Sequence, residues 1–206
     1  MGETSATLEN PPAQSPSFTT TKLTKPEEVS KYMTQLCQIL QDCVNQGASI
    51  GFLAPLSTEE ATTYWTQVSN LITTPTQHLF ILTSSSSTPS NPPNPTILAT
   101  VQLTVSPKIT HVHKAEVVKL LVAPSARRQG IARKLMEHVE DFARDEGKEF
   151  LVLDTATESP AREMYRRLGW EEWGTCKDYA SWPDGSRCDA TFFRKELGTI
   201  RTQEEE

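Results

Sequence analysis

The chain has 206 residues, of which 36% are hydrophobic and 22% are charged, and its formal net charge is −6. This length and composition suit one globular domain with a substantial core, and the acidic balance argues against general nucleic-acid binding, which needs a basic face. No apolar run approaches the length of a membrane span, and the first ten residues, MGETSATLEN, have no feature of a signal peptide.

The chain pattern predicts a mixed α/β fold between two polar tails. We expect a disordered tail at 1–17, one domain at 18–198 and an acidic tail at 199–206. In chain order, the expected elements are a strand at 17–24, helices at 24–47 and from 57, strands at 78–83, 96–105 and 115–124, a helix at 129–146, a strand at 150–155, a helix at 159–170 and two strands joined by a turn at 183–185.

Capping boxes mark the start of the first two helices. Thr24 is expected to cap the first, with Pro26 in its first turn and Glu27 reaching back to the cap. Ser57 and Glu60 are expected to form the second box in the same way.

The segment SARRQG, residues 125–130, places two arginines and a glycine where the 129–146 helix begins. The first turn of a helix already carries unpaired N–H groups and the positive end of the dipole, so added positive charge is unfavourable there unless an anion binds. Gly130 would let an anion approach the backbone, and Arg127 and Arg128 would supply charge nearby. The segment predicts a phosphate site, although a basic loop before a surface helix is the simpler alternative.

Two segments resemble the GNAT acetyltransferase family. RRQGIA at 127–132 follows the strand VVKLLVAP and resembles the family's Arg/Gln-x-x-Gly-x-Gly/Ala signature. AREMYRRLGW at 161–170 is similar to the family's Ala-x-x-x-Tyr-x-x-x-Gly-Phe pattern, with Trp170 in place of Phe. Within the family, AEVVKLLVAPSAR at 115–127, LDT at 153–155 and the closing PDG…FF.K.L at 183–197 look like the tabtoxin-resistance acetyltransferase group, and this resemblance covers approximately residues 96–197.

This resemblance implies a GNAT fold, a mixed twisted sheet of six to seven strands flanked by about four helices, over residues 18–198. It implies acetyl-CoA as co-substrate and no metal. By the resemblance, the cofactor-binding residues are Leu121, Val122, Arg127, Arg128, Gln129, Gly130, Ile131 and Ala132.

Acetyl transfer to an amine needs a base for the amine, donors for the oxyanion and a proton for the departing thiolate. Glu116 is one candidate base, because simple alternation places it on one face of its strand with Val118, Leu120 and Val122, and apolar neighbours raise a carboxyl pKa. A salt bridge to a neighbouring lysine of the strand is the alternative role.

Asp154 ends the strand FLVLD, at the sheet edge where ligands gather in α/β proteins. The resemblance implies that Glu116 and Asp154 activate and orient the amine, without dividing the two roles, whereas capping the next helix is the alternative for Asp154. It also implies that Tyr165 protonates the sulfur, whereas a packed aromatic is the alternative. Backbone N–H groups around Leu121 or Val122 are the expected oxyanion donors.

Four further side chains are secondary candidates. His111 and His113 would share a face of a strand, but no third ligand stands at a recognisable spacing, so we expect substrate-side polar residues rather than a metal site. Tyr179 and Trp182, near the last turn, would either wall an acceptor pocket or pack in the core.

The leading hypothesis is a small-molecule amine N-acetyltransferase that works by direct attack, with detoxification of a toxin or antimetabolite as its expected role. The alternatives are a protein acetyltransferase acting on lysines or an N-terminus, for which the polar 84–95 loop would be a docking feature, and a non-catalytic acyl-CoA-binding module. The four cysteines lack metal spacing and are expected to be reduced in a cytoplasmic protein, with the nucleus open. We expect no nucleic-acid or membrane partner, and the sequence leaves monomer and homodimer open.

Overall fold

The computed structural model describes residues 17–85 and 95–198. The tails expected at 1–17 and 199–206 therefore lie outside the described residues, except for Ser17, which begins the first strand. Nearly all of the 84–95 loop also lies outside the described residues. The described elements are β1 (Ser17–Leu23), α1 (Pro26–Asn45), α2 (Thr58–Leu71), β2 (Gln77–Ser85), β3 (Thr96–Thr104), β4 (Lys114–Val122), α3 (Ile131–Asp145), β5 (Phe150–Ala156), α4 (Pro160–Arg167), β6 (Glu171–Ser181) and β7 (Arg187–Glu196). This order confirms the α/β fold and each expected helix and strand.

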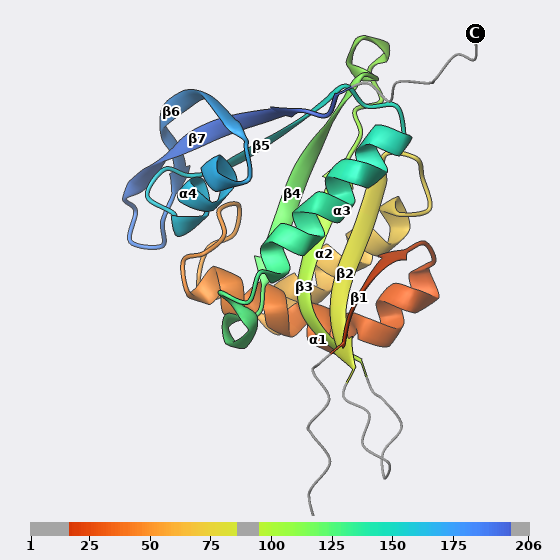
Figure 1. The fold of residues 1–206 in the computed structure, drawn as a ribbon. Helices are drawn as coiled ribbons and strands as arrows, with labels where there is room; N and C mark the ends of the chain where they lie inside the picture. Colours follow the sequence, from red (N-terminus) through yellow and green to blue (C-terminus); the bar gives the residue numbers. More distant parts are fainter. Residues whose placement is uncertain (1–16, 86–94, 199–206) are drawn as a thin grey trace, which may run out of the picture.

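One sheet contains all seven described strands, in the order β1-β2-β3-β4-β5-β7-β6. Every neighbouring pair is antiparallel except β4 and β5, which are parallel and pair only between 114–116 and 150–152. Beyond that short ladder the two strands diverge, and β5, β7 and β6 turn away from the rest of the sheet (Figure 1). The sheet is therefore open in its middle.

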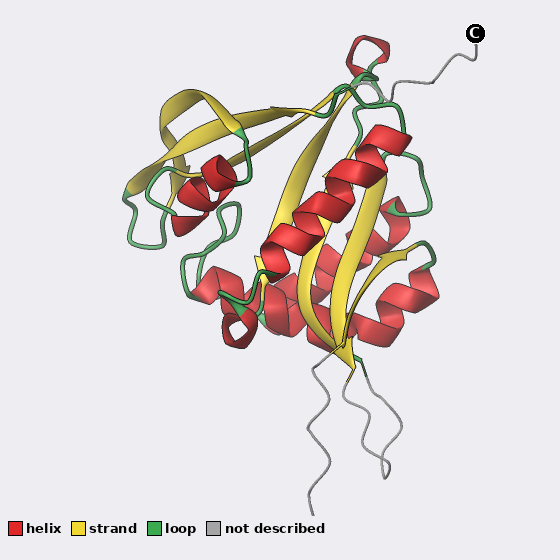
Figure 2. Ribbon diagram, in the orientation of Figure 1, coloured by secondary structure: helices red, strands yellow, loops and turns green. Residues whose placement is uncertain are grey.

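Helices cover both faces of this sheet (Figure 2). On one face, α3 and α4 pack on a core that contains Leu135 and Val139 from α3 and Tyr165 from α4. On the other face, α1 and α2 pack on a second core around Leu36 and Trp65, and the Trp65 indole N–H donates to the Leu36 carbonyl oxygen at 2.8 Å. These two layers fix the positions of the loops that meet at the opening in the sheet.

One expected capping box is confirmed and the other is wrong by one residue. The Ser57 N–H donates to the Glu60 carboxylate at 2.9 Å, and the Glu60 N–H donates to Ser57 Oγ at 3.1 Å. At α1 the cap is Lys25 rather than Thr24, and Glu28 rather than Glu27 accepts the Lys25 N–H at 3.0 Å. The shift follows from Pro26, which takes the first helical position, so the third helical residue is Glu28.

Simple alternation along β4 is also wrong, because a β-bulge interrupts the strand. Val118 pairs with Gln102 and Leu121 pairs with Thr100, so two residues of β4 stand opposite one residue of β3. Lys119, in the bulge, has a φ of +54°. Glu116 and Val118 therefore share a face with Leu121, whereas Leu120 and Val122 pack on the α3 side.

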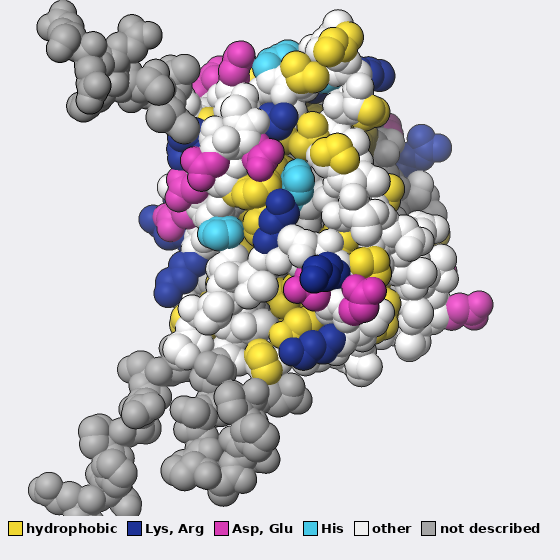
Figure 3. All heavy atoms as spheres, turned by 90° about the vertical axis from the view of Figure 1, so that its right-hand side faces the viewer, with side chains coloured by type: hydrophobic (Ala, Val, Ile, Leu, Met, Phe, Trp, Pro, Cys, Tyr) yellow, Lys and Arg dark blue, Asp and Glu magenta, His cyan; other side chains and the backbone are white. Residues whose placement is uncertain are grey.

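The surface mixes charges of both signs. On the face seen in Figure 3, lysine and arginine side chains lie among acidic and apolar ones.

No described helix combines the length and the apolar character that crossing a bilayer requires. Cys37 and Cys43 are free thiols buried in the core under α1.

Candidate active site

Two adjoining cavities lie where β4 and β5 diverge. The first, of about 460 Å³, contains the Asp154 side chain and is called here the carboxylate cavity. The second, of about 790 Å³, contains Gly130 and several arginines and is called the arginine cavity. Five residues line both cavities: Ala48 in the loop after α1, Leu120 in β4, Ser159 just before α4, and Ala161 and Tyr165 in α4. A ligand can therefore extend from one cavity into the other.

The floor of the arginine cavity is the N-terminus of α3. Gly130 is the cap, with a φ of +75°, and Arg128 before it has a φ of +64°. The first hydrogen bond inside the helix runs from the Lys134 N–H to the Gly130 carbonyl oxygen, at 3.1 Å, so the N–H groups of the first turn have no acceptor within the helix. A Cβ on Gly130 would meet no atom within 4 Å, so the space above this turn is open.

Arginines from two helices and one loop line this cavity. Arg128 comes from the loop, Arg133 from α3 and Arg167 from α4. Together with the N–H groups of the helix, they make the cavity suited to a phosphate or pyrophosphate group. Sequence reasoning did not select Arg133 and Arg167, because their approach to Gly130 depends on how α3 and α4 pack.

Of the remaining predicted cofactor residues, all but Gln129 border one of the two cavities. Arg127 also borders the arginine cavity, but its guanidinium donates to Gln46 Oε1 at 2.9 Å and to the Val122 carbonyl oxygen at 3.3 Å, and so ties the end of α1 to the end of β4. The Gln129 side chain donates back to the Ser125 carbonyl oxygen and does not border either cavity. Val122, Ile131 and Ala132 border the arginine cavity, and Leu121 borders the carboxylate cavity.

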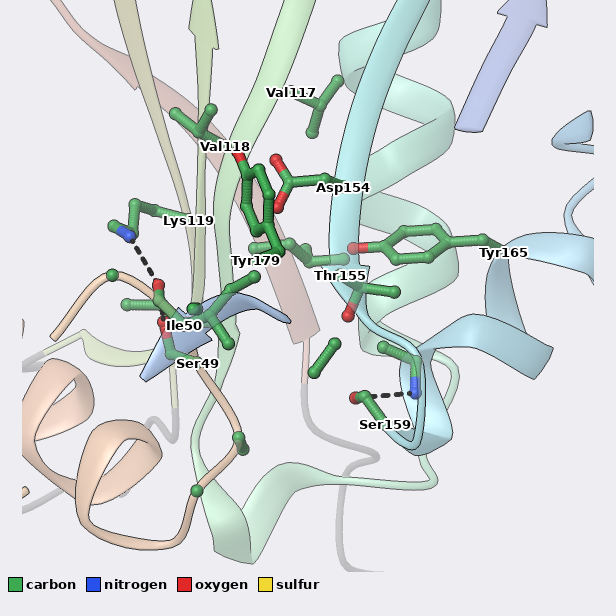
Figure 4. A pocket seen from close by; sticks show the side chains of 18 residues that line it. Ser49, Ile50, Val117, Val118, Lys119, Asp154, Thr155, Ser159, Tyr165 and Tyr179 are labelled. Atoms are coloured by element: carbon green, nitrogen blue, oxygen red, sulfur yellow. Dashed lines mark hydrogen bonds between the residues drawn. The ribbon is translucent and has the colours of Figure 1, made fainter. Parts of the chain in front are cut away.

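Asp154 lies in β5, two residues before the strand ends, and is directed into the carboxylate cavity (Figure 4). Burial raises the pKa of its carboxyl group, and the positive charge of Lys119 opposes that rise. No described residue donates a hydrogen bond to this carboxylate. Capping of α4, the alternative role, belongs to Ser159, whose Oγ accepts the Ala161 N–H at 3.2 Å.

Glu116 lies at the narrow end of the opening, in register with Val152 on β5. Burial of the carboxyl group and the nearby negative charge of Asp154 both raise its pKa, and Lys114 opposes the rise. The side chain is nevertheless exposed and does not border the carboxylate cavity. Among the described residues it forms no salt bridge, so the alternative role as an ion-paired strand residue is not observed.

Tyr165 stands between the two cavities. Its ring packs against Phe193, with centroids 5.5 Å apart, and near Trp170, and the side chain is only 6% exposed. Its hydroxyl nevertheless points toward the carboxylate cavity (Figure 4). Burial and the charge of Asp154 raise the Tyr165 pKa well above its usual range, so the phenol stays protonated at physiological pH. The residue is therefore a packed aromatic whose protonated hydroxyl is directed toward the carboxylate cavity.

Lys119 is a cavity residue that sequence reasoning did not select. Its ammonium donates to the Ile50 carbonyl oxygen at 3.3 Å and lies 4.9 Å from the centre of the Phe52 ring. Burial lowers its pKa, and the negative charge of Asp154 opposes that change. No local signal marks this position, because the bulge that places it depends on pairing with β3.

Of the two aromatic candidates near the last turn, the structure places one at the cavity. Tyr179 borders the carboxylate cavity and packs edge-on against Phe192, with centroids 5.3 Å apart. It follows Asp178, whose φ is +54°, at a register shift between β6 and β7. Trp182 lies in the turn and borders neither cavity.

The two histidines do not lie in a strand, contrary to expectation. His111 ends a short 3-10 helix, Ile109–His111, and His113 lies in the turn before β4, where its ring packs against Phe150. Both precede the end of β4 that is farther from the cavities. Within residues 17–85 and 95–198, no group of three or more His, Cys, Asp or Glu side chains is placed to hold a metal ion.

Comparison with known proteins identifies relatives of this architecture. The family model described as "Acetyltransferase (GNAT) family" matches residues 56–170. An N-acetyltransferase from Azospirillum brasilense, encoded in the hisH-hisA intergenic region, is 30% identical over 162 residues, which cover 72% of this chain and 87% of the relative.

A second relative matches over a shorter segment. Streptothricin acetyltransferase from Streptomyces lavendulae is 48% identical over 50 residues, so the match spans only 26% of that protein and 24% of this chain. Among solved structures, a Salmonella typhimurium protein with its cofactor acetyl-CoA is similar, with a TM-score of 0.65 and 16% identity over 88% of this chain and 94% of that one.

Proposed function

This chain is a member of the GNAT acetyltransferase family, and from that premise we propose that it transfers the acetyl group of acetyl-CoA to a primary amine of a small molecule. The observation that carries the proposal is the meeting of the arginine cavity and the carboxylate cavity at Tyr165. The short match to streptothricin acetyltransferase favours detoxification of a toxic amine as the role. We propose that the protein acts in the cytoplasm.

In this proposal the arginine cavity holds acetyl-CoA. Its pyrophosphate would accept hydrogen bonds from the N–H groups of the first turn of α3, next to the left-handed Gly130, where a side chain would occupy the approach. Arg128, Arg133 and Arg167 would neutralise its charge. The pantetheine arm would follow the backbone of Leu121 and Val122 toward Tyr165.

We assign the role of general base to Asp154 rather than Glu116. An alkyl amine carries a proton at neutral pH and must lose it before its nitrogen attacks the acetyl carbonyl carbon. Asp154 borders the carboxylate cavity, and its raised pKa makes it a stronger base than an exposed aspartate, either directly or through one water. Glu116 lies farther out and would orient the amine electrostatically as it enters.

Tyr165 and the β4 bulge would complete the reaction. When the carbon–sulfur bond breaks, the Tyr165 hydroxyl would give its proton to the thiolate sulfur. The buried phenol is protonated before this step, as an acid must be. The oxyanion would accept hydrogen bonds from backbone N–H groups around Leu121 or Val122, next to the bulge that interrupts the β3–β4 ladder.

The test is a screen for thiol release from acetyl-CoA with panels of small amines, amino acids and peptides with basic tails. We expect at least one small amine to accelerate thiol release, and we expect the acceleration to disappear in Asp154→Asn. Acceleration only by peptides would replace the small-molecule acceptor with a protein acceptor. No acceleration by any amine would contradict catalysis and leave an acyl-CoA-binding module.

A further inference from the structure

The carboxylate cavity is lined by an ammonium group and a carboxylate that form no salt bridge with any described residue. Lys119 on β4 and Asp154 on β5 both border it, and each acts on the pKa of the other through its charge. The two groups are nevertheless not within ion-pair distance of each other, since the salt bridges of the described residues include neither. The Lys119 ammonium is directed toward Ile50 rather than toward Asp154 (Figure 4), so the two opposite charges lie at separate places on the lining of the cavity.

The Lys119 ammonium group is held in place but retains capacity for a ligand. The loop after α1 surrounds it: Ile50 accepts one hydrogen bond, the Phe52 ring lies beneath it, and a Cβ on Gly51 would come within 3.3 Å of Nζ. An ammonium group has three N–H donors, and Ile50 uses one. No other acceptor among the described residues reaches Nζ, so two donors remain for a ligand.

Two non-glycine backbone positions at or beside this cavity have positive φ angles, which indicates a functional role for these positions. Only three non-glycine residues in the described part of the chain have positive φ, namely Lys119, Arg128 and Asp178. Lys119 lines the carboxylate cavity, Asp178 precedes Tyr179, which also lines it, and Arg128 lines the arginine cavity. Such conformations cost free energy and concentrate at ligand sites.

From this geometry, and resting on the proposed function above, we propose that the acceptor is an amine that also carries a carboxylate, as a free amino acid does. The Asp154 carboxylate binds the amino group of the acceptor, and the Lys119 ammonium donates a hydrogen bond to the carboxylate of the same molecule. Lys119 is then a specificity residue that distinguishes an amino acid from a simple amine. A charge-assisted hydrogen bond of this kind changes affinity by about tenfold to a hundredfold.

The experiment compares matched acceptors that differ only in the anionic group. Each free L-amino acid is assayed beside its carboxamide and the corresponding decarboxylated amine, with acetyl-CoA, and kcat/KM is determined for each. We expect the wild-type protein to prefer the best free acid over its carboxamide by at least about tenfold. In Lys119→Met we expect the preference to disappear through loss of kcat/KM for the acid, with the value for the carboxamide nearly unchanged.

Methionine keeps an unbranched stem at the strained backbone position, so the variant removes the charge together with the hydrogen bond to Ile50 and the contact with the Phe52 ring. The carboxamide substrate controls for any movement of the loop after α1. Lys119→Arg, which retains a cation, is expected to recover part of the preference. Lys31→Met, at an exposed lysine of α1, is the matched control and is expected to behave like the wild type. A thermal shift with acetyl-CoA verifies that each variant folds and binds the co-substrate.

Two results would overturn the proposal while leaving acetyl transfer to amines intact. One is equal kcat/KM for acids, carboxamides and decarboxylated amines in the wild type. The other is a preference for acids that survives in Lys119→Met. If no amine of any kind is acetylated, the proposed function itself fails, and this inference fails with it.

Discussion

At the scale of single residues, the packing of Tyr165 is observed, and we propose that the same residue also acts as the acid. Its ring is part of the core on the α3 side, and its hydroxyl points toward the carboxylate cavity. The described residues give that hydroxyl no hydrogen-bond partner. Removing the oxygen should therefore cost the fold little while removing the proposed acid.

We predict that Tyr165→Phe lowers kcat by about a hundredfold or more, which is the usual scale for one acid–base group, and changes KM far less. The measurement is steady-state thiol release with an acceptor found by the screen. Tyr64→Phe is the control, because Tyr64 is a partly buried phenol that accepts a hydrogen bond from Gln102 at 2.8 Å and lies outside both cavities. Unchanged turnover in Tyr165→Phe would leave this residue with a packing role only.

We predict that Asp154 sets the acidic limb of the pH profile. Its pKa is raised, so activity should fall as the pH drops through a value above the ordinary aspartate pKa of about 3.9. Asp154→Asn should lower kcat by about a hundredfold and remove this limb, whereas Glu116→Gln should keep the limb. The measurement is kcat/KM against pH for the three proteins.

Stability provides the control for Asp154. A pKa raised in the folded state means that the folded protein holds the proton more tightly than the unfolded chain, so this group's contribution to stability is present at low pH and lost as pH rises through the raised pKa. Near neutral pH, Asp154→Asn should therefore not lower the melting temperature. A loss of activity that accompanied a large loss of stability would argue for a structural role.

At the scale of elements, local signals were predictable and long-range pairing was not. Ser57 and Glu60 are close together in the chain, and their capping box follows from the sequence, whereas the same kind of signal at α1 was wrong by one residue. The expected 129–146 helix begins at Ile131, with Gly130 as its cap. The bulge at Lys119 depends on how β4 pairs with β3, so simple alternation gave the wrong face for Leu120. The same limit explains why Arg167 was missed, since only the packing of α4 brings it to the arginine cavity.

We predict that Gly130→Glu abolishes acetyl-CoA binding, because a negatively charged side chain would enter the proposed pyrophosphate site at the start of α3. The measurement is the rise in melting temperature that saturating acetyl-CoA produces. Gly147→Glu is the matched control: Gly147 follows the other end of α3, has a φ of +72° and also has no atom within 4 Å of a Cβ. Its backbone strain is thus similar, but it should retain the shift. Retention of the shift in Gly130→Glu would place the pyrophosphate elsewhere.

At the scale of the whole molecule, the open sheet positions the site. The strands β4 and β5 pair over three residues and then diverge, and the arginine and carboxylate cavities lie at the divergence. The order of elements and the family were both predictable from the sequence, whereas the shape of the carboxylate cavity was not. That cavity combines the loop after α1 with β4, β5, α4 and β6, which are far apart in the chain.

We predict that acetyl-CoA stabilises the folded protein, because it would fill the opening between the two parts of the sheet. Ligand at a hundred times its dissociation constant should add about 2.7 kcal/mol to the free energy of unfolding. For a chain of this size, that corresponds to a rise in melting temperature of roughly 5–10 °C. The measurement is a melting curve with increasing acetyl-CoA, with adenosine as the control for non-specific binding. Absence of a shift at saturating concentration would contradict the assignment of the arginine cavity.

The most direct test of acetyl transfer to a small amine is identification of the product. The protein is incubated with acetyl-CoA and the best acceptor of the screen, and the acceptor is recovered and analysed by mass spectrometry while free thiol is measured in the same sample. The account predicts an acceptor that has gained one acetyl group on its amine nitrogen, in an amount equal to the thiol released. Thiol release without an acetylated acceptor would contradict it, since acetyl-CoA would then be hydrolysed and no amine would be the substrate.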